Sequence, residues 1–311
     1  MWKNKACLIC CALLGLTLSG QACARSYDDV LDSGYIKIAV YKDFPPYSWM
    51  DDGTAKGIDV ALARRIADEL GVRLDILWLT PDENLDADLR NAIWRGPRID
   101  NTVSDDNASR LQKNIADVMM RVPYDREYSE RRDELGLLKN ELVHMLAPYQ
   151  REQWQIAYDG RKIDEVETIA VFQYHTIGVE IDSIPSFYMM SAFNGRMRDK
   201  TRHYATLTDA FEAMQTQQVD AVMGMKTRIS WLLAGAGDDN LKYADNAFPT
   251  MGRQTWDIGI AIHDHYRQLG YAVGDVIDAE IRSGRLQAWF EEHELLYDLP
   301  DYYRRLDTGT E

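Results

Sequence analysis

The sequence predicts an α/β protein made of two similar units, each a mainly parallel sheet flanked by helices. Residues 35–79 read as strand, helix and strand, which is the order of a parallel βαβ unit. A second alternation of strands and helices runs through residues 176–224. The segments NAIWRG and IADVMM in the first half resemble EAMQTQ and VDAVMG in the second, because each pair is a helix end followed by an apolar strand with an early aspartate.

The first unit begins with YIKIAVY at residues 35–41, an alternating segment rich in β-branched and aromatic residues, which breaks at a Pro-Pro turn. Residues 57–70 place apolar side chains at helical spacing, and Gly71 ends the predicted helix. Further elements are expected as a strand at 74–79, a helix at 85–94 and a strand at 115–120.

The rest of the chain continues the pattern after one polar insertion. Residues 95–114 are rich in Asn, Asp, Ser and Arg and lack apolar periodicity, which predicts a surface loop, either a plain insertion or a lid. In the second half we expect strands at 176–180 and 219–224, a helix from Ser186 and a helix at 205–215. The last part is expected to hold a strand at 256–262 and helices at 266–283 and 286–292.

The first 24 residues have the pattern of a secretory signal peptide. Lys3 and Lys5 precede an apolar run at residues 8–18, and a small-residue cleavage site follows. The apolar run is too short to span a bilayer, which needs about 20 residues. Cleavage would release the mature chain into the periplasm. Acylation of Cys23 is the alternative, although the bulky Gln21 before it disfavours lipid attachment.

The mature chain lacks cysteine and is strongly acidic. All four cysteines lie within the leader, which excludes disulfides, zinc–thiolate sites, iron–sulfur clusters and cysteine nucleophiles from the mature protein. The formal charge of −15 becomes −17 once the two leader lysines are removed, so nucleic acid and anionic lipid are poor partners. The acidity either serves solubility or favours a cationic ligand or partner.

With its elements in this order, the chain resembles the type II periplasmic binding proteins, and among them the polar amino-acid-binding family 3. The resemblance covers nearly the whole mature chain and depends on four segments that follow the family's order. These are YIKIAVYKDFPPYSWMDDGTAKGIDVALARRIADELG, TIGVEIDSI, TLTDAFEAMQTQQVDAVMG and WDIGIAIHDHYRQLGYAVGDVIDAEIRSGRLQAWFEEH. It implies two α/β lobes that close on a ligand held in the cleft between them.

The resemblance also implies the division of the chain. Lobe 1 would comprise residues 27–141 plus 256–311, and lobe 2 residues 142–255, after a signal peptide at residues 1–24. We expect a monomer of the periplasm, without catalytic activity, cofactor or bound metal. Its partners would be a small-molecule ligand and either the permease of an ABC transporter or a periplasmic dehydrogenase.

In lobe 1 the resemblance points to the loop after the first strand as part of the ligand site. Phe44 matches the aromatic residue that packs on the ligand in the family, and Tyr47 and Trp49 lie close enough in sequence to share that wall. The alternative is that these rings cap the core of the lobe. Asp59 matches a family aspartate at a helix start, where a carboxylate would satisfy free amide donors.

The residues that bind a free amino acid in the family are altered here. Ser183 retains a hydroxyl at the turn that opens a lobe 2 helix, but Asp182 and Ile184 beside it weaken anion capture. Met225 stands where the family has its ammonium-binding aspartate. Candidates for the family's ligand-binding arginine, which has no clear match, are Arg121, Arg126 and Arg131. Arg121 follows a buried strand and is the candidate for the cleft, with a surface salt bridge as the alternative.

The cleft is therefore expected to take a molecule other than a standard amino acid. Phe44, Trp49 and Met225 would give it a soft, largely apolar wall. Further candidates for this wall, some of which would instead lie in the core, are Met119, Met120, Met223 and Trp256. No metal site is expected, because the histidine cluster His263-Asp264-His265 has no third ligand nearby in the sequence.

Three functions fit these features. The first is a periplasmic receptor that captures a small ligand for a transport system. The second is an accessory protein of a periplasmic quinoprotein dehydrogenase, as in the methanol-oxidation J-type members of the family. The third is a carrier of an apolar ligand such as a lipid or sterol. No phosphate-binding loop, GxSxG elbow or HExxH motif points to an enzyme.

Overall fold

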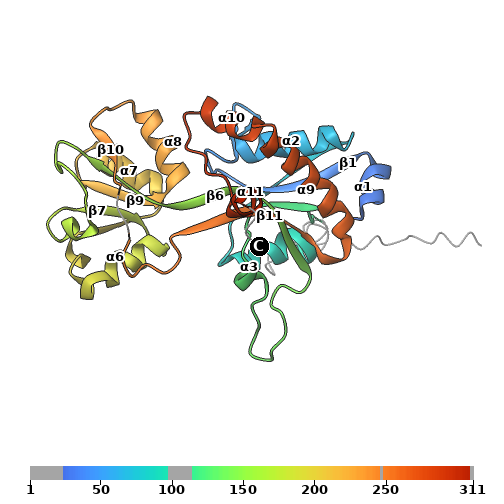
Figure 1. Cartoon of the computed structure of the whole chain (residues 1–311), viewed down its shortest axis with the longest axis horizontal. Helices are drawn as coiled ribbons and strands as arrows, with labels where there is room; N and C mark the ends of the chain where they lie inside the picture. The colour runs from blue at the N-terminus through green and yellow to red at the C-terminus, as the bar shows by residue number, and fades with distance from the viewer. Residues whose placement is uncertain (1–23, 97–113, 246–247, 309–311) are drawn as a thin grey trace, which may run out of the picture.

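The structure, a computed structural model, describes residues 24–96, 114–245 and 248–308. It has two lobes that lie side by side (Figure 1). Two long strands, β6 (Val143–Asp159) and β11 (Thr255–His263), run between the lobes and join them (Figure 1). The protein is therefore an α/β molecule of two lobes joined by two strands.

The elements follow one another in three groups. The first part of the chain forms α1 (Tyr27–Ser33), β1 (Tyr35–Tyr41), β2 (Trp49–Asp51), β3 (Thr54–Lys56), α2 (Ile58–Glu69), β4 (Arg73–Leu79), α3 (Leu85–Leu89), the π-helix η1 (Arg90–Trp94), β5 (Val118–Pro123) and α5 (Arg126–Ser129). After β6 come η2 (Ile169–Gln173), β7 (Ile177–Glu180), α6 (Ile184–Gly195), η3 (Arg198–Lys200), β8 (Thr201–Tyr204), α7 (Leu207–Gln215), β9 (Ala221–Met225), α8 (Lys226–Ala236) and β10 (Leu241–Tyr243). After β11 come η4 (Asp264–Tyr266), α9 (Arg267–Arg282), α10 (Arg285–Glu292) and α11 (Asp301–Thr308).

The strands form one continuous sheet in the order β4-β1-β5-β11-β6-β9-β7-β8, with β10 paired to β6. In lobe 1, β1 lies between β4 and β5 and is parallel to both. In lobe 2, β7 lies between β8 and β9 in the same parallel arrangement. Each parallel trio borders a long antiparallel strand, β11 in lobe 1 and β6 in lobe 2. The two lobes thus repeat one topology, as the sequence predicts.

Strand β6 belongs to both lobes. Its first part pairs with β11 from Val143 to Gln153, and its last part pairs with β9 and β10 from Trp154 to Asp159. A strand of 17 residues exceeds the common strand length of about 5–6 residues. This length lets one strand cross from one core to the other without a break.

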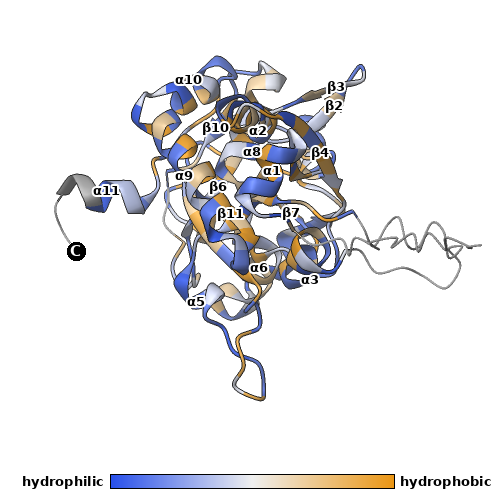
Figure 2. Cartoon of the chain, turned by 90° about the vertical axis from the view of Figure 1, so that its right-hand side faces the viewer, coloured by the Kyte–Doolittle hydropathy of each residue, from blue (hydrophilic) through white to orange (hydrophobic). Residues whose placement is uncertain are grey.

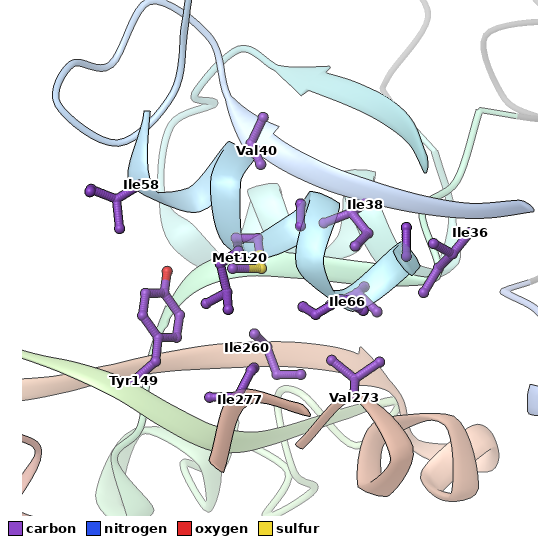
Figure 3. Close-up of a cluster of buried hydrophobic side chains, with 14 of the residues drawn as sticks. Ile36, Ile38, Val40, Ile58, Ile66, Met120, Tyr149, Ile260, Val273 and Ile277 are labelled. Atoms are coloured by element: carbon purple, nitrogen blue, oxygen red, sulfur yellow. The ribbon is translucent and has the colours of Figure 1, made fainter. Parts of the chain in front are cut away.

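Each lobe has apolar cores on both faces of its sheet, because successive side chains of a strand point to opposite sides. In β1, Ile38 belongs to the cluster beneath α2 and α9, whereas its neighbour Ala39 faces α3 and η1. In β9 of lobe 2, Met223 and Val222 divide in the same way. Figure 3 shows the first of these clusters, where β1, α2, β11 and α9 bring their isoleucines together. Burial of each such side chain contributes about 1.5–3 kcal/mol.

The predicted elements occur with shifted boundaries at several points. The third strand begins at Val118 rather than residue 115. Just before it, the Asp117 side chain accepts a hydrogen bond from the backbone N–H of Lys37 (2.8 Å), and the backbone N–H of Asp117 donates to the Lys37 carbonyl (2.8 Å). The helix predicted at 85–94 changes to π-helical geometry at Arg90. The helix expected from Ser186 begins two residues earlier, at Ile184, because Ser183 caps it.

Two predictions lie largely outside the described residues. These are the signal peptide, at residues 1–24, and most of the 95–114 insertion. Within the described ranges, no helix combines the length and the apolar character needed to cross a membrane. The lobe boundaries given above stay a prediction.

Candidate ligand-binding site

The loop after β1 is closed by backbone hydrogen bonds and holds two of the predicted aromatic residues. The backbone N–H of Phe44 donates to the carbonyl of Ser48 (2.8 Å), and the N–H of Ser48 donates back to Phe44 (3.0 Å). Phe44 is half-buried and Tyr47 wholly buried, with their ring centroids 5.3 Å apart. Trp49 turns to the other lobe, where its ring lies 5.4 Å from that of Trp231 in α8.

Arg121 lies directly beside this loop. Its guanidinium carbon is 3.3 Å from the centroid of the Tyr47 ring, and its Nη1 donates to Gln150 Oε1 (3.0 Å). Nη1 is also 3.8 Å from Asp59 Oδ1. The side chain is 4% exposed, so the surface salt bridge considered from the sequence is wrong. Burial opposes its charge, but the tyrosines and carboxylates around it outweigh this effect and raise its pKa.

Asp59 faces inward and does not cap helix α2. The cap position is Gly57, which has no side chain to offer, and Asp59 accepts a hydrogen bond from the hydroxyl of Tyr149 (2.9 Å). Figure 3 shows the Tyr149 hydroxyl pointing from β6 toward the start of α2. Asp59 is wholly buried, its Oδ2 has no hydrogen-bond partner, and burial raises its pKa to about 6 against the opposing effect of Arg121. The expected capping role is therefore wrong.

Glu152 of β6 extends the same group of polar side chains toward lobe 2. It accepts hydrogen bonds from the Tyr47 hydroxyl (2.7 Å) and from the backbone N–H of Thr227 (3.3 Å). Gln150 donates to the Thr227 hydroxyl (2.8 Å). Burial raises the pKa of Glu152. We call this group the buried polar cluster; it comprises Tyr47, Asp59, Arg121, Tyr149, Gln150, Glu152 and Thr227.

We expect the difference in stability between Asp59→Asn and the wild type to shift in favour of the variant as the pH rises from about 4 to about 7. Because the pKa of Asp59 is raised in the folded state, its contribution to stability is complete below the unfolded value of 3.8 and is lost as the pH rises through about 6. Asparagine resembles the protonated carboxyl and suffers no such loss. Urea unfolding of both proteins across this range measures the difference, and a difference independent of pH would contradict the assignment.

The predicted residues of lobe 2 lie at the edge of the sheet that faces lobe 1. The Ser183 hydroxyl accepts from the backbone N–H of Ser186 (3.2 Å) and donates to the carbonyl of Glu180 (2.6 Å), so it serves as a helix cap. Met225 ends β9, where it pairs with Trp154, and precedes α8. The structure thus brings Phe44, Tyr47 and Arg121 together and holds Ser183 and Met225 on the opposite lobe.

An open cavity of about 810 Å³ lies where the two lobes meet. The end of β5 contributes Pro123 and α5 contributes Tyr128, while α6 of lobe 2 contributes Ile184. The crossing strands supply Trp154 and Trp256, whose ring centroids are 4.7 Å apart. Charged residues that also line it are Asp125, Glu127, Arg131 and Arg253. The cavity is large enough for an organic molecule of moderate size.

The sequence identified this cavity only in part. Trp256 was among the candidates for the apolar wall, and it lines the cavity. Met119, Met120 and Met223 instead belong to the cores and are at most 1% exposed. Trp154 was not anticipated. Its signal is an aromatic residue within the polar segment QREQWQ; in the pairing of the crossing strands Trp256 lies opposite Glu152, two residues before Trp154.

A second cavity, of about 570 Å³, borders the first and shares Asp125, Glu127, Arg253 and Trp256 with it. Its other walls are mostly charged, with Arg151 contacting both Asp257 and Asp301. Among the residues that the structure describes, no group of three or more His, Cys, Asp or Glu side chains is placed to hold a metal ion.

Comparison with known proteins finds a partial match in sequence and a wider match in fold. Residues 36–92 match the model of the bacterial extracellular solute-binding proteins, family 3. A stretch of 71 residues, 22% of this chain, is 37% identical to a cyclohexadienyl dehydratase of Pseudomonas aeruginosa, and it spans 26% of that protein.

Two solved structures extend the likeness of the fold over most of the chain. An ancestral cationic amino-acid solute-binding protein matches with a TM-score of 0.62 and 16% identity, over 86% of this chain and 98% of that one. A substrate-binding protein of an amino-acid ABC transporter from Streptococcus pneumoniae, bound to L-arginine, matches with a TM-score of 0.58 and 18% identity, over 86% and 97%. The chain thus shares its two-lobed fold with these two proteins, and residues 36–92 carry the pattern of the family 3 extracellular solute-binding proteins.

Proposed function

We propose that this protein is a periplasmic solute-binding protein that holds a largely apolar organic molecule in the 810 Å³ cavity and presents it to the permease of an ABC transporter. The observation that carries the proposal is the position of this cavity. It takes walls from both lobes and from the two crossing strands, so a ligand there would contact every part that moves when the lobes close. The predicted signal peptide supports export to the periplasm.

The lining favours an aromatic or otherwise apolar ligand over a free amino acid. Trp154 and Trp256 offer large rings at the base of the cavity, and Ile184 and Pro123 add apolar walls. Arg253 is already paired with Asp125 and Glu127, and Arg131 with Asp86, which leaves less charge to bind a carboxylate. The ligand is therefore held mainly by burial of apolar surface. A lipid or sterol belongs to this class as well.

Binding, rather than catalysis, also agrees with the state of the buried carboxylates. Asp59 and Glu152 are enclosed by tyrosine and arginine side chains and are absent from the lining of the cavity, while the two carboxylates that line it, Asp125 and Glu127, are paired with Arg253. A general acid or base must come within hydrogen-bond reach of its substrate. In this arrangement neither carboxylate would reach a molecule in the cavity, which supports the proposal of a non-catalytic receptor.

A thermal-shift screen of the mature protein tests the proposal. We expect aromatic and apolar compounds to raise the unfolding temperature in a saturable way, because a ligand at 100 times its Kd adds about 2.7 kcal/mol. L-Arginine, other amino acids and simple amines are expected to give no shift. Trp256→Leu should weaken binding of any hit by about 1–3 kcal/mol, since it removes ring contact.

The matched control is Trp289→Leu in α10, since this ring packs on the lobe 1 core and is absent from the lining of the cavity. It should leave the affinity unchanged. If L-arginine bound tightly and Trp256→Leu did not change its affinity, this cavity would be excluded as the ligand site. The site would then be assigned to the region around Phe44.

A second candidate function is that of an accessory protein for a periplasmic quinoprotein dehydrogenase, and one surface feature favours a protein partner. The loop between α5 and β6 projects from the body of lobe 1 and carries apolar residues near its end (Figure 2). Leu135 is 83% exposed and Leu137 58% exposed. Two exposed leucines close together on a projecting loop offer an apolar surface to another protein.

If this loop binds a partner, the double variant Leu135→Ser/Leu137→Ser should lose co-elution with the purified dehydrogenase in size-exclusion chromatography. Its unfolding temperature should match that of the wild type, because both side chains are exposed. Equal co-elution of variant and wild type would exclude the loop as the contact, and no co-elution of the wild type would argue against the accessory function.

A further inference from the structure

Two arginines of the chain itself cover the two rings of the loop after β1. Arg121, from the same lobe, lies over Tyr47, as described above. Arg228 comes from α8 of the opposite lobe, and its guanidinium carbon is 5.0 Å from the centroid of the Phe44 ring. The ring that the family resemblance assigns to the ligand is thus in contact with a cation of the protein. Arg228 reaches this ring across the junction of the lobes.

The surroundings of Arg228 fix its guanidinium group in place through a ring and a carboxylate. The residue is 8% exposed, and its Nη1 lies 3.5 Å from Glu180 Oε2 at the end of β7. A ring on one side and a carboxylate at its edge are the two contacts that proteins use to hold a planar guanidinium. Burial lowers the pKa of Arg228, and Glu180 opposes this effect. The cost of burying this charge is therefore offset by contacts from both lobes.

The first turn of α8 is attached to the rest of the molecule by three successive residues. Lys226 Nζ donates to Asp298 Oδ2 (2.6 Å), Thr227 contacts Gln150 and Glu152, and Arg228 contacts Phe44. Positive charge is unfavourable at the N-terminus of a helix, and this turn holds two cations and no acidic residue. The presence of Lys226 and Arg228 in this turn is therefore explained by the groups that they contact and not by a contribution to the stability of the helix.

We propose that Phe44 and Glu180 form a guanidinium site between the lobes and that Arg228 is its permanent, covalently tethered occupant. With Arg228 in place, this part of the cleft is closed to free cations and the lobes are held together there. The open cavity at Trp154 and Trp256 is then the part of the cleft left for a ligand. The site would accept a free guanidinium compound only after the Arg228 side chain is removed.

The test is chemical rescue of the mature Arg228→Ala protein. We expect its unfolding temperature to fall by about 2 to 8 °C, from the usual size of a cation–π contact in a chain of this length. Methylguanidinium chloride at low millimolar concentration should restore at least half of this loss in a saturable way. The same salt should leave the wild type unchanged, because its site is already filled. Sodium chloride and methylammonium chloride at equal concentration should not rescue.

Two further variants separate this site from general effects of charge. Lys226→Ala removes the neighbouring cation with its own ion pair to Asp298, and methylguanidinium should not rescue it. Phe44→Leu, combined with Arg228→Ala, should abolish the rescue because the ring face is gone. If Arg228→Ala fails to fold, Arg228→Gln takes its place in the same experiment.

Absence of saturable rescue in a folded Arg228 variant, or equal rescue by sodium chloride, would overturn the proposal. The outcome does not depend on the ligand of the wild type, since no compound from the ligand screen is used. A failure of the apolar-ligand proposal and a failure of this one are therefore distinguishable.

Discussion

Replacing Arg121 by methionine is expected to destabilise the protein by about 3–5 kcal/mol, because it leaves buried carboxylates without their cation. Asp59 and Glu152 are both wholly buried, and the charge of Arg121 favours the ionised form of each. Methionine retains an unbranched apolar stem beside the Tyr47 ring, so the main change is the loss of charge. Chemical denaturation at neutral pH measures the loss.

Arg126→Met is the matched control for this prediction. Its side chain is 86% exposed and pairs only at the surface with Glu130, so its removal should cost less than about 1 kcal/mol. Adding Asp59→Asn and Glu152→Gln to Arg121→Met should recover much of the lost stability, since no buried charge is then unpaired. A single Arg121→Met variant as stable as the Arg126→Met control would show that the buried polar cluster does not depend on this cation.

Gly57→Ala is expected to destabilise the protein by about 2–6 kcal/mol, the sum of a strained backbone and a steric clash. Gly57 has φ +113°, and a Cβ built there would lie 2.2 Å from the carbonyl oxygen of Tyr47. That carbonyl also accepts the backbone N–H of Asp59 (2.9 Å). The added methyl group would thus displace the loop that positions Tyr47, and with it the start of α2.

Gly53→Ala isolates the backbone part of this effect. Gly53 has φ +77°, but a Cβ there would have no atom within 4 Å. We expect it to cost only the strain, about 1–3 kcal/mol, when unfolding is followed by denaturant titration. Equal losses for the two glycine variants would mean that the contact with the Tyr47 carbonyl is unimportant.

The sequence predicted the repeated α/β architecture because that architecture depends on local patterns. YIKIAVY matches β1 from Tyr35 to Tyr41, and the helical spacing after Gly57 matches α2. In these segments the apolar side chains that make the pattern are also the ones that fill the core. Short elements such as β8 and β10 carry too few residues to show any periodicity.

The longest strand was not predicted, for a physical reason. The β6 segment contains Pro148 and the polar run QREQ, which resembles a loop in sequence. Gln150 and Glu152 in this run are nevertheless fully buried, because they bond to Arg121, Tyr47 and Thr227. The partners of a buried polar residue come from distant parts of the chain, so no local pattern reveals them. For the same reason the sequence named Phe44, Tyr47 and Arg121 but not Arg228 or Trp154.

Strand β6 also constrains how the two lobes could move. Two lobes joined by flexible linkers would turn freely, whereas here the two lobes are connected by hydrogen-bonded strands of one sheet. Rotation of one lobe relative to the other would then have to twist and bend β6 and β11. The pairing of β6 with β11 shifts register between Ile258 and Ile260, where residues 147–149 of β6 lie opposite Gly259. Any change in the angle between the lobes is therefore coupled to the shape of the sheet that both lobes share.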